Sequence, residues 1–174
     1  DSVKIDNCGS SQNVTRYAEL FNKTGKPIQI ENCHNQFGPD LQTGACPMNF
    51  YRSGGDIHPG LEDVVGKVYS TVLFNDRPVP ASYPGCWAYP DMSEVGNWNP
   101  SPTRYDEEQA HWGLWAIVSS PMVLGFDMSD VKTLDRVWPI ITNTEVLAVN
   151  HDWAGQPGTL VKTYGAEGAR LMVQ

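Results

Sequence analysis

Short segments of alternating apolar and polar residues recur along the chain, and each ends in a polar or small-residue turn. Alternation over roughly four to eight residues is typical of a β-strand, because successive side chains point to opposite faces. The first four such segments are 3–6, 28–32, 49–52 and 86–89. Apolar residues at helical spacing predict helices over 13–23, 61–75, 105–120, 132–141 and 144–150. This regular succession of strand and helix predicts a parallel α/β fold.

The C-terminal third adds one more strand and then changes in character. The apolar segment Met122–Gly125 predicts a fifth parallel strand that is fully buried. A glycine-rich linker at 155–158 precedes strand-like segments around glycine-rich turns. We therefore expect two units, with residues 1–158 in the α/β domain and residues 159–174 at the beginning of an antiparallel β domain.

Polar residues follow four of the predicted strands: Asp6, His34, Asp56 and Asp91. A (β/α)8 TIM barrel collects its catalytic groups at the C-terminal ends of different strands, which matches this placement. A doubly wound nucleotide-binding sheet needs a glycine-rich phosphate loop, and the sequence has none. Five strands in a chain shorter than the roughly 250 residues of a full barrel predict a partial TIM barrel, about the last five βα units. We expect the remainder upstream or in another chain.

The charge balance and the apolar runs exclude some classes of partner. The chain has 174 residues and a net charge of −8, with 20 acidic residues against 12 basic ones. This excess makes nucleic acid and anionic membranes poor partners, so a neutral substrate is expected. No apolar run approaches the roughly 20 residues of a membrane span.

The cysteines and two tripeptides bear on the cellular compartment. The four cysteines are Cys8, Cys33, Cys46 and Cys86. They have no CxxC spacing, so no metal site is expected. Glycosylation sequons begin at Asn13 and Asn22. Together these features predict an oxidising compartment, where at least one disulfide can form.

Two carboxylates stand out as candidate catalytic groups. Lys4 and Asp6 lie two residues apart and so point to the same side of the first strand, where the cation favours an ionised, nucleophilic carboxylate. Taken alone, this stretch favours an ordinary strand-end ion pair. A second strand, ending in Ser53-Gly54-Gly55, delivers Asp56 with Arg52 close by. The pair of carboxylates favours acid–base or nucleophilic chemistry.

Five short motifs together resemble a known family. They are Lys4-Ile5-Asp6-Asn7-Cys8, Tyr51-Arg52-Ser53-Gly54-Gly55-Asp56-Ile57, Trp87-Ala88-Tyr89-Pro90-Asp91-Met92 with Gly96-Asn97, Leu114-Trp115-Ala116-Ile117 and Val149-Asn150-His151-Asp152. Their order and spacing resemble those of the α-galactosidases of glycoside hydrolase family 27. The resemblance extends to about residue 158, and the tail resembles the start of that family's C-terminal β-sandwich.

The resemblance implies a retaining glycosidase that needs no cofactor and no metal. It places the nucleophile at Asp6 and the acid/base at Asp56. The implied substrate-binding residues are Lys4, Arg52, His34, Asp91 and Met92. Retaining hydrolysis needs two carboxyl groups about 5 to 5.5 Å apart, one ionised and one protonated. Asp56 has no cation adjacent in sequence, and whether Arg52 pairs with a sugar hydroxyl or with Asp6 stays open.

The loop after the second strand departs from the family pattern. The family usually has Glu or Asn followed by Trp after the cysteine, where this chain has His34 and Asn35. That loop reads the substituent at the second carbon of the sugar. Galactose, N-acetylgalactosamine and arabinopyranose therefore all stay open as the preferred sugar, and His34 is either a substrate-loop residue or a plain loop histidine.

The resemblance also implies a pairing of cysteines. Cys33 and Cys46 match the position of a family disulfide, and we predict that this pair forms. Cys8 resembles a cysteine whose partner lies upstream. Cys86 has no family counterpart, and we expect it to be a buried thiol.

Two hypotheses for function follow. The first is an α-galactosidase that acts on terminal α-galactose of a saccharide. Its partners would be the remaining half of the barrel and, in a homo-oligomer, further copies of the protein. The second is a non-catalytic carbohydrate-binding or structural relative in an extracellular assembly. The presence of both carboxylates favours the enzyme. The sequons and cysteines favour a secreted, lysosomal or vacuolar protein.

Overall fold

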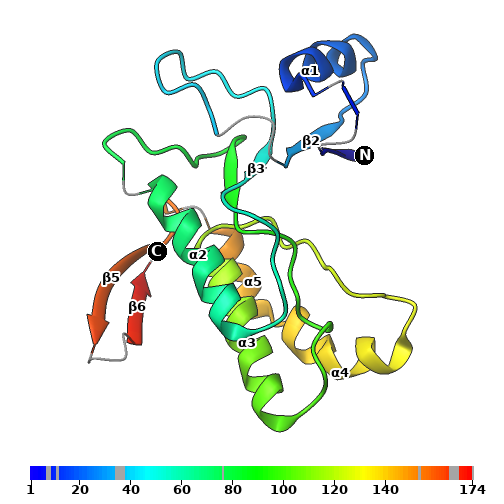
Figure 1. Ribbon diagram of the computed structural model, residues 1–174, viewed down its shortest axis with the longest axis vertical. Helices are drawn as coiled ribbons and strands as arrows, with labels where there is room; N and C mark the ends of the chain where they lie inside the picture. The colour runs from blue at the N-terminus through cyan, green and yellow to red at the C-terminus, as the bar shows by residue number, and fades with distance from the viewer. Residues whose placement is uncertain are drawn as a thin grey trace.

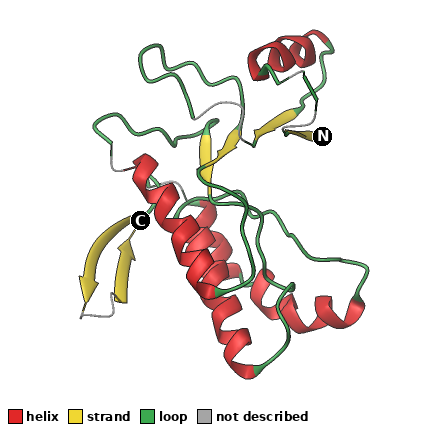
Figure 2. Cartoon of the chain, viewed as in Figure 1, coloured by secondary structure: helices red, strands yellow, loops and turns green. Residues whose placement is uncertain are grey.

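The elements lie along the chain much as the apolar pattern predicts (Figures 1 and 2). The computed structural model describes residues 1–6, 9–10, 12–33, 38–75, 77–152, 154–164 and 169–173. Its strands are β1 (Ser2–Ile5), β2 (Gln29–Asn32), β3 (Phe50–Arg52), β4 (Trp87–Tyr89), β5 (Thr159–Tyr164) and β6 (Ala169–Val173). Its helices are α1 (Val14–Lys23), α2 (Leu61–Asn75), α3 (Pro102–Ile117), α4 (Val131–Ile141) and α5 (Thr144–His151).

Strands β1 to β4 form one parallel sheet in which they lie in the order of the chain. In register, Lys4 of β1 lies beside Glu31 of β2, and Arg52 of β3 lies beside Tyr89 of β4. Barrels place consecutive parallel strands side by side, whereas a doubly wound sheet reverses its strand order partway. The α/β fold is confirmed, and its sheet is consistent with part of a barrel.

The two faces of this sheet differ sharply in polarity. Ile5, Ile30, Tyr51 and Ala88 are buried in one apolar cluster, against which residues of α1 pack. Side chains alternate along each strand, so Lys4, Glu31, Arg52 and Tyr89 lie on the opposite face. This second set carries charges and a hydroxyl, and we call it the polar face of the sheet. In an α/β barrel the helices cover the outer face of the sheet, and the active site lies at the C-terminal ends of the strands.

Local capping explains where the helices begin. The side-chain oxygen of Asn13 accepts a hydrogen bond from the amide of Arg16 at 2.9 Å, which satisfies one of the open donors at the start of α1. Ser101 does the same for α3 and is followed by Pro102 in the first turn, a position that proline favours. These are local signals, and the helices accordingly lie close to their predicted positions.

A buried ion pair joins helix α3 to α4 and to the loop after β4. Glu108 is fully buried and accepts two hydrogen bonds from the guanidinium of Arg136, one of them 3.1 Å long. The amide of Gly96 donates to the same carboxylate at 2.8 Å. Gly96 has a φ of +95°, and a Cβ there would lie 2.7 Å from the ring of Phe126. The buried carboxylate of Glu108 therefore fixes the loop that carries Asp91 to helices α3 and α4.

The prediction of a fully buried strand over 122–125 is wrong. This segment forms an isolated parallel bridge in which Leu124 lies beside Ser93, and Val123 is 37% exposed. The bridge is closed by two hydrogen bonds, from the amide of Ser93 to Val123 at 2.7 Å and from the amide of Gly125 to Ser93 at 3.0 Å. An apolar run signals burial, but a parallel strand also needs partners along its length, and one bridge does not provide them.

The tail forms a separate antiparallel pair of strands. β5 pairs with β6 and is not part of the parallel sheet. This is the change in character that the glycine-rich linker indicates, and the division into two domains at residue 158 stays a prediction. Among the described helices, none is long and apolar enough to cross a membrane.

Candidate active site

Asp6 lies directly after β1, on the polar face of the sheet. Its Oδ2 atom is 3.7 Å from the ammonium of Lys4, as the alternation along the strand predicts. The same ammonium lies 3.7 Å from the Oε1 atom of Glu31. Lys4 is thus shared between two carboxylates. This sharing leaves an opposite charge near Asp6 that favours its ionised form without engaging it fully.

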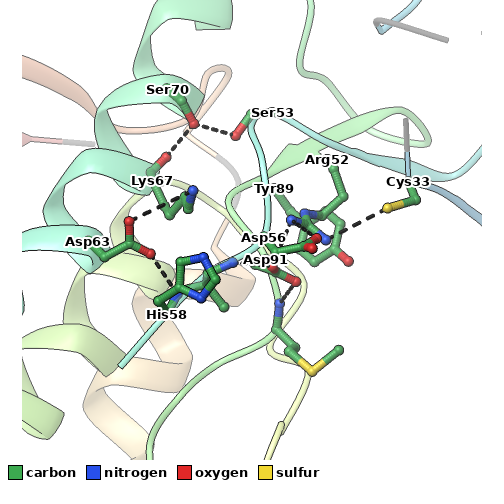
Figure 3. A network of polar contacts seen from close by, with 12 residues as sticks. Cys33, Arg52, Ser53, Asp56, His58, Asp63, Lys67, Ser70, Tyr89 and Asp91 are labelled. Carbon is green, nitrogen blue, oxygen red and sulfur yellow. Dashed lines mark hydrogen bonds and ion pairs between the residues drawn. The ribbon is translucent and has the colours of Figure 1, made fainter. Parts of the chain in front are cut away.

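Arg52 is the centre of the second group of contacts (Figure 3). Its side chain is 1% exposed, and its Nη2 atom lies 2.8 Å from Asp91 and 3.1 Å from Asp56. The Nη1 atom reaches the sulfur of Cys33 at 3.8 Å. Burial is the largest single influence and opposes the charge on Arg52, but Asp91, Cys33, Tyr89 and Asp56 together outweigh it, so the pKa of the guanidinium is raised. Arg52 is therefore a fixed cation that joins three side chains.

Asp91 connects the end of β4 to the loop that carries Asp56. One of its oxygens accepts from the amide of Ile57 at 2.8 Å, and the other accepts from the amide of Met92 at 2.7 Å. The indole of Trp115 donates to the carbonyl of Asp91 at 2.7 Å. With Arg52 also in contact, both carboxylate oxygens have partners, and the side chain is 4% exposed. Asp91 therefore fixes the relative positions of Arg52, Ile57 and Trp115 at this end of the sheet.

Asp56 is placed very differently from Asp91. Its side chain is 74% exposed and contacts Arg52 alone among the ion pairs of the described chain. The loop before it is held by the hydroxyl of Ser53, which hydrogen-bonds Ser70 at 2.9 Å (Figure 3). The same hydroxyl hydrogen-bonds Thr71 at 2.8 Å. A loop held in place by hydrogen bonds, with a carboxyl group that faces solvent, suits a group that must meet a substrate.

The thiol of Cys33 joins the two groups of contacts. It hydrogen-bonds Asp6, and it lies beside Arg52. Burial raises its pKa to about 11, against the opposing charges of Lys4 and Arg52 and with a smaller contribution from Asp6. The sulfur therefore stays protonated at neutral pH and can donate to the carboxylate. Asp6 and Asp56, predicted from separate strands, are linked through Cys33 and Arg52 at one edge of the sheet.

The predicted disulfide between Cys33 and Cys46 is wrong. Cys46 is bonded to Cys86, with their Cα atoms 6.1 Å apart, so the expectation of a buried thiol at Cys86 is also wrong. The reason lies in the two faces of the sheet. Cys46 and Cys86 pack in the apolar cluster with Met48, whereas Cys33 contacts Arg52 and Asp6 on the polar face.

The other candidate residues are placed as follows. His34, Asn35 and Cys8 lie outside the described residues. Met92 is partly buried at the site, and Asn13 and Asn22 are exposed on either end of α1. Arg52, for which a sugar hydroxyl or Asp6 was expected as partner, contacts Asp91 and Asp56. In the part of the chain that the structure describes, no group of three or more His, Cys, Asp or Glu residues could hold a metal.

Sequence reasoning missed Glu31 and Tyr89. The hydroxyl of Tyr89 donates a hydrogen bond to Glu31, across the intervening strand β3. A signal for Glu31 was present, because it alternates with Ile30 and so shares a face with Lys4. No local signal pairs Tyr89 with a residue 58 positions earlier.

The chain is similar to several known proteins. The sequence profile of a family described as Alpha galactosidase A matches residues 1–152. An α-galactosidase of Lachancea cidri is 32% identical over 194 residues, covering 94% of this chain and 40% of the relative. An α-galactosidase of Oryza sativa subsp. japonica is 31% identical over 169 residues, covering 94% of this chain and 38% of the relative.

A solved structure supports the fold. A Bacteroides fragilis protein, provisionally named an alpha-galactosidase, superposes with a TM-score of 0.64 at 18% identity, over 91% of this chain and 37% of that one. The chain spans about two fifths of the length of the curated relatives that it matches, 40% and 38% for the two above.

Proposed function

The chain belongs to the alpha galactosidase A family, whose profile spans residues 1–152, and on that premise we propose that it contributes both catalytic carboxyl groups to a retaining α-galactosidase. The observation that carries the proposal is the shared edge of the sheet, where Asp6 and Asp56 are linked through Cys33 and Arg52. Two carboxyl groups from different strand ends, facing one polar surface, are what a double displacement requires.

Asp6 is the proposed nucleophile. Its ionised form is favoured by Lys4 at 3.7 Å, and the thiol of Cys33 donates to it. In the first step a carboxylate oxygen of Asp6 bonds to the anomeric carbon while the glycosidic C–O bond breaks. The product is a galactosyl ester of Asp6, which water then hydrolyses.

Asp56 is the proposed acid and base. It donates a proton to the leaving oxygen in the first step and takes one from water in the second. The guanidinium of Arg52 lies 3.1 Å from its carboxyl group. Lys4, Arg52, His34, Asp91 and Met92 are proposed to line the sugar site.

The proposed substrate is a saccharide with a terminal α-galactosyl residue. N-acetylgalactosaminides and arabinopyranosides are the nearest alternatives, to be compared directly in the assay. The Cys46–Cys86 disulfide and the exposed sequons at Asn13 and Asn22 support a secreted or vacuolar, glycosylated protein.

The test compares two leaving groups in the natural full-length protein. Asp6→Asn removes the nucleophile and is expected to abolish turnover of nitrophenyl α-galactoside and of a galactosyl disaccharide alike. Asp56→Asn removes the acid, so the loss is expected to be about 100-fold or more larger for the disaccharide, whose leaving group needs the proton. Asp40→Asn, an exposed loop carboxylate, is the control. Unchanged turnover in Asp6→Asn refutes the assignment, and absence of turnover in the unaltered protein favours a binding role.

A further inference from the structure

Glu31 and Tyr89 form a hydrogen-bonded pair on the polar face, in which Tyr89 is buried and the Glu31 side chain is 12% exposed; the proposed reaction does not involve this pair. Glu31 lies in β2 beside Lys4 in β1, and Tyr89 lies at the end of β4. The hydroxyl of Tyr89 donates to the Oε1 atom of Glu31. The ammonium of Lys4 lies 3.7 Å from that same oxygen. One atom of Glu31 therefore meets both the hydroxyl and the cation.

We infer that Glu31 and Tyr89 are positioning residues, which hold the ammonium of Lys4 between two carboxylates so that it stays beside Asp6 without direct contact. This inference rests on the proposed function. The three contacts form a continuous series across the sheet, from Tyr89 to Glu31, from Glu31 to Lys4 and from Lys4 to Asp6.

Tyr89 is well suited to be the fixed end of this series. Its side chain is buried, and its ring meets that of Phe50 edge to face at 5.2 Å between centroids. Burial and the charge of Glu31 raise the pKa of the Tyr89 hydroxyl, so it remains a donor at any working pH. A buried hydroxyl with one charged acceptor defines the position of that acceptor closely.

Glu31 affects the distance between the ammonium of Lys4 and the carboxylate of Asp6. A lysine side chain is flexible, and an ammonium with one carboxylate neighbour moves to direct contact, at about 2.7 to 2.9 Å. Such a contact places a strong donor on the oxygen of Asp6 that must attack, and the ground state of the nucleophile is stabilised. With Glu31 present, Lys4 stays 3.7 Å from each carboxylate. Glu31 therefore limits how tightly Lys4 binds Asp6.

The experiment measures the nucleophilic step directly in the natural full-length protein. A fluorinated α-galactosyl fluoride forms a long-lived ester on the nucleophile, so its stoichiometry counts folded sites and its rate constant reports attack by Asp6. Glu31→Gln is expected to trap at a rate about tenfold lower with unchanged stoichiometry. Tyr89→Phe is expected to slow trapping in the same direction by a smaller factor.

Two matched variants serve as controls. Glu19→Gln removes the same carboxylate charge from an exposed ion pair with Arg16 on α1. Tyr83→Phe removes a hydroxyl that donates to Gly44 at 3.3 Å. Both are expected to trap at the unaltered rate.

The outcomes separate this inference from the proposed function. No trapping in the unaltered protein overturns both. Trapping of the unaltered protein with equal rate constants in Glu31→Gln and Tyr89→Phe overturns the positioning role alone. If Glu31→Gln shows low stoichiometry because it misfolds, Tyr89→Phe decides, and an unchanged rate there overturns the role.

Discussion

Replacing Asp91 with Asn tests whether the buried carboxylate holds the end of the sheet. Asp91 is 4% exposed and lies 2.8 Å from the Nη2 atom of Arg52, whose side chain is 1% exposed. Asn has nearly the same shape but no charge, so Asp56, which is exposed, is the one ionic partner that Arg52 keeps among the described residues. Breaking a buried pair in this way costs about 3 to 5 kcal/mol.

The backbone contacts of Asp91 refine this magnitude. Its two oxygens accept from the amides of Ile57 and Met92 at 2.8 and 2.7 Å. Asn retains one carbonyl oxygen, so one of these bonds survives and the other amide faces an NH2 group. Since Asp56 still neutralises part of the charge on Arg52, we expect the lower end of the range, a loss of about 3 kcal/mol in the free energy of unfolding.

Urea unfolding followed by tryptophan fluorescence measures this loss, because Trp115 donates to the carbonyl of Asp91 and reports the same region. Asp135→Asn is the matched control, an exposed carboxylate on α4 whose removal is expected to cost about 0.5 kcal/mol or less. If the two variants differ by less than about 1 kcal/mol, the ion pair does not stabilise the site and the reasoning is refuted.

Three further predictions concern protons and sulfur. Burial lowers the pKa of His111 to about 3, so below about pH 6.5 the unfolded chain binds a proton that the folded chain does not. The free energy of unfolding is therefore expected to fall by about 2 kcal/mol from pH 7.5 to pH 5. The variant His111→Phe should lack this part of the pH dependence. Burial raises the pKa of Cys33 from 9.0 to about 11, which leaves about 100-fold less thiolate at pH 8. Iodoacetamide should therefore label Cys33 at least about 100-fold more slowly than a thiol with an unshifted pKa. Equal labelling rates would contradict the burial of Cys33. Peptide mapping without reduction should recover Cys46 linked to Cys86 across 40 positions, and Ser at both should cost about 4 kcal/mol of stability; recovery of a Cys33–Cys46 peptide would contradict the structure.

Much of the fold could be predicted from the sequence because its signals are local. The cap at Asn13 and the apolar spacing of α2 lie within a few residues of the elements they specify. The placement of Lys4 and Asp6 on one side of β1 also follows from alternation alone. The segment 122–125 shows the limit, since an apolar run does not reveal how many neighbours a strand will find.

Some residues of the candidate site were named from the sequence, but their contacts were not predicted. Arg52 and Asp91 were both named from the sequence, and their ion pair was not. The partner of Cys46 could not be chosen from spacing, because the choice depends on which face of the sheet each sulfur occupies.

Apart from the segment 122–125, the sequence alone determined the succession of strands and helices and the candidate carboxylates at two strand ends, because these are specified by neighbours in the chain. It also determined the acidic charge balance, which follows from composition. Only the tertiary structure decided that Arg52 forms ion pairs with Asp56 and Asp91. It also decided that the thiol of Cys33 lies beside Asp6, and that the hydroxyl of Tyr89 hydrogen-bonds Glu31 across β3. The physical reason is that parallel strands bring distant residues into register, and the charge pairing that follows is a property of the assembled sheet.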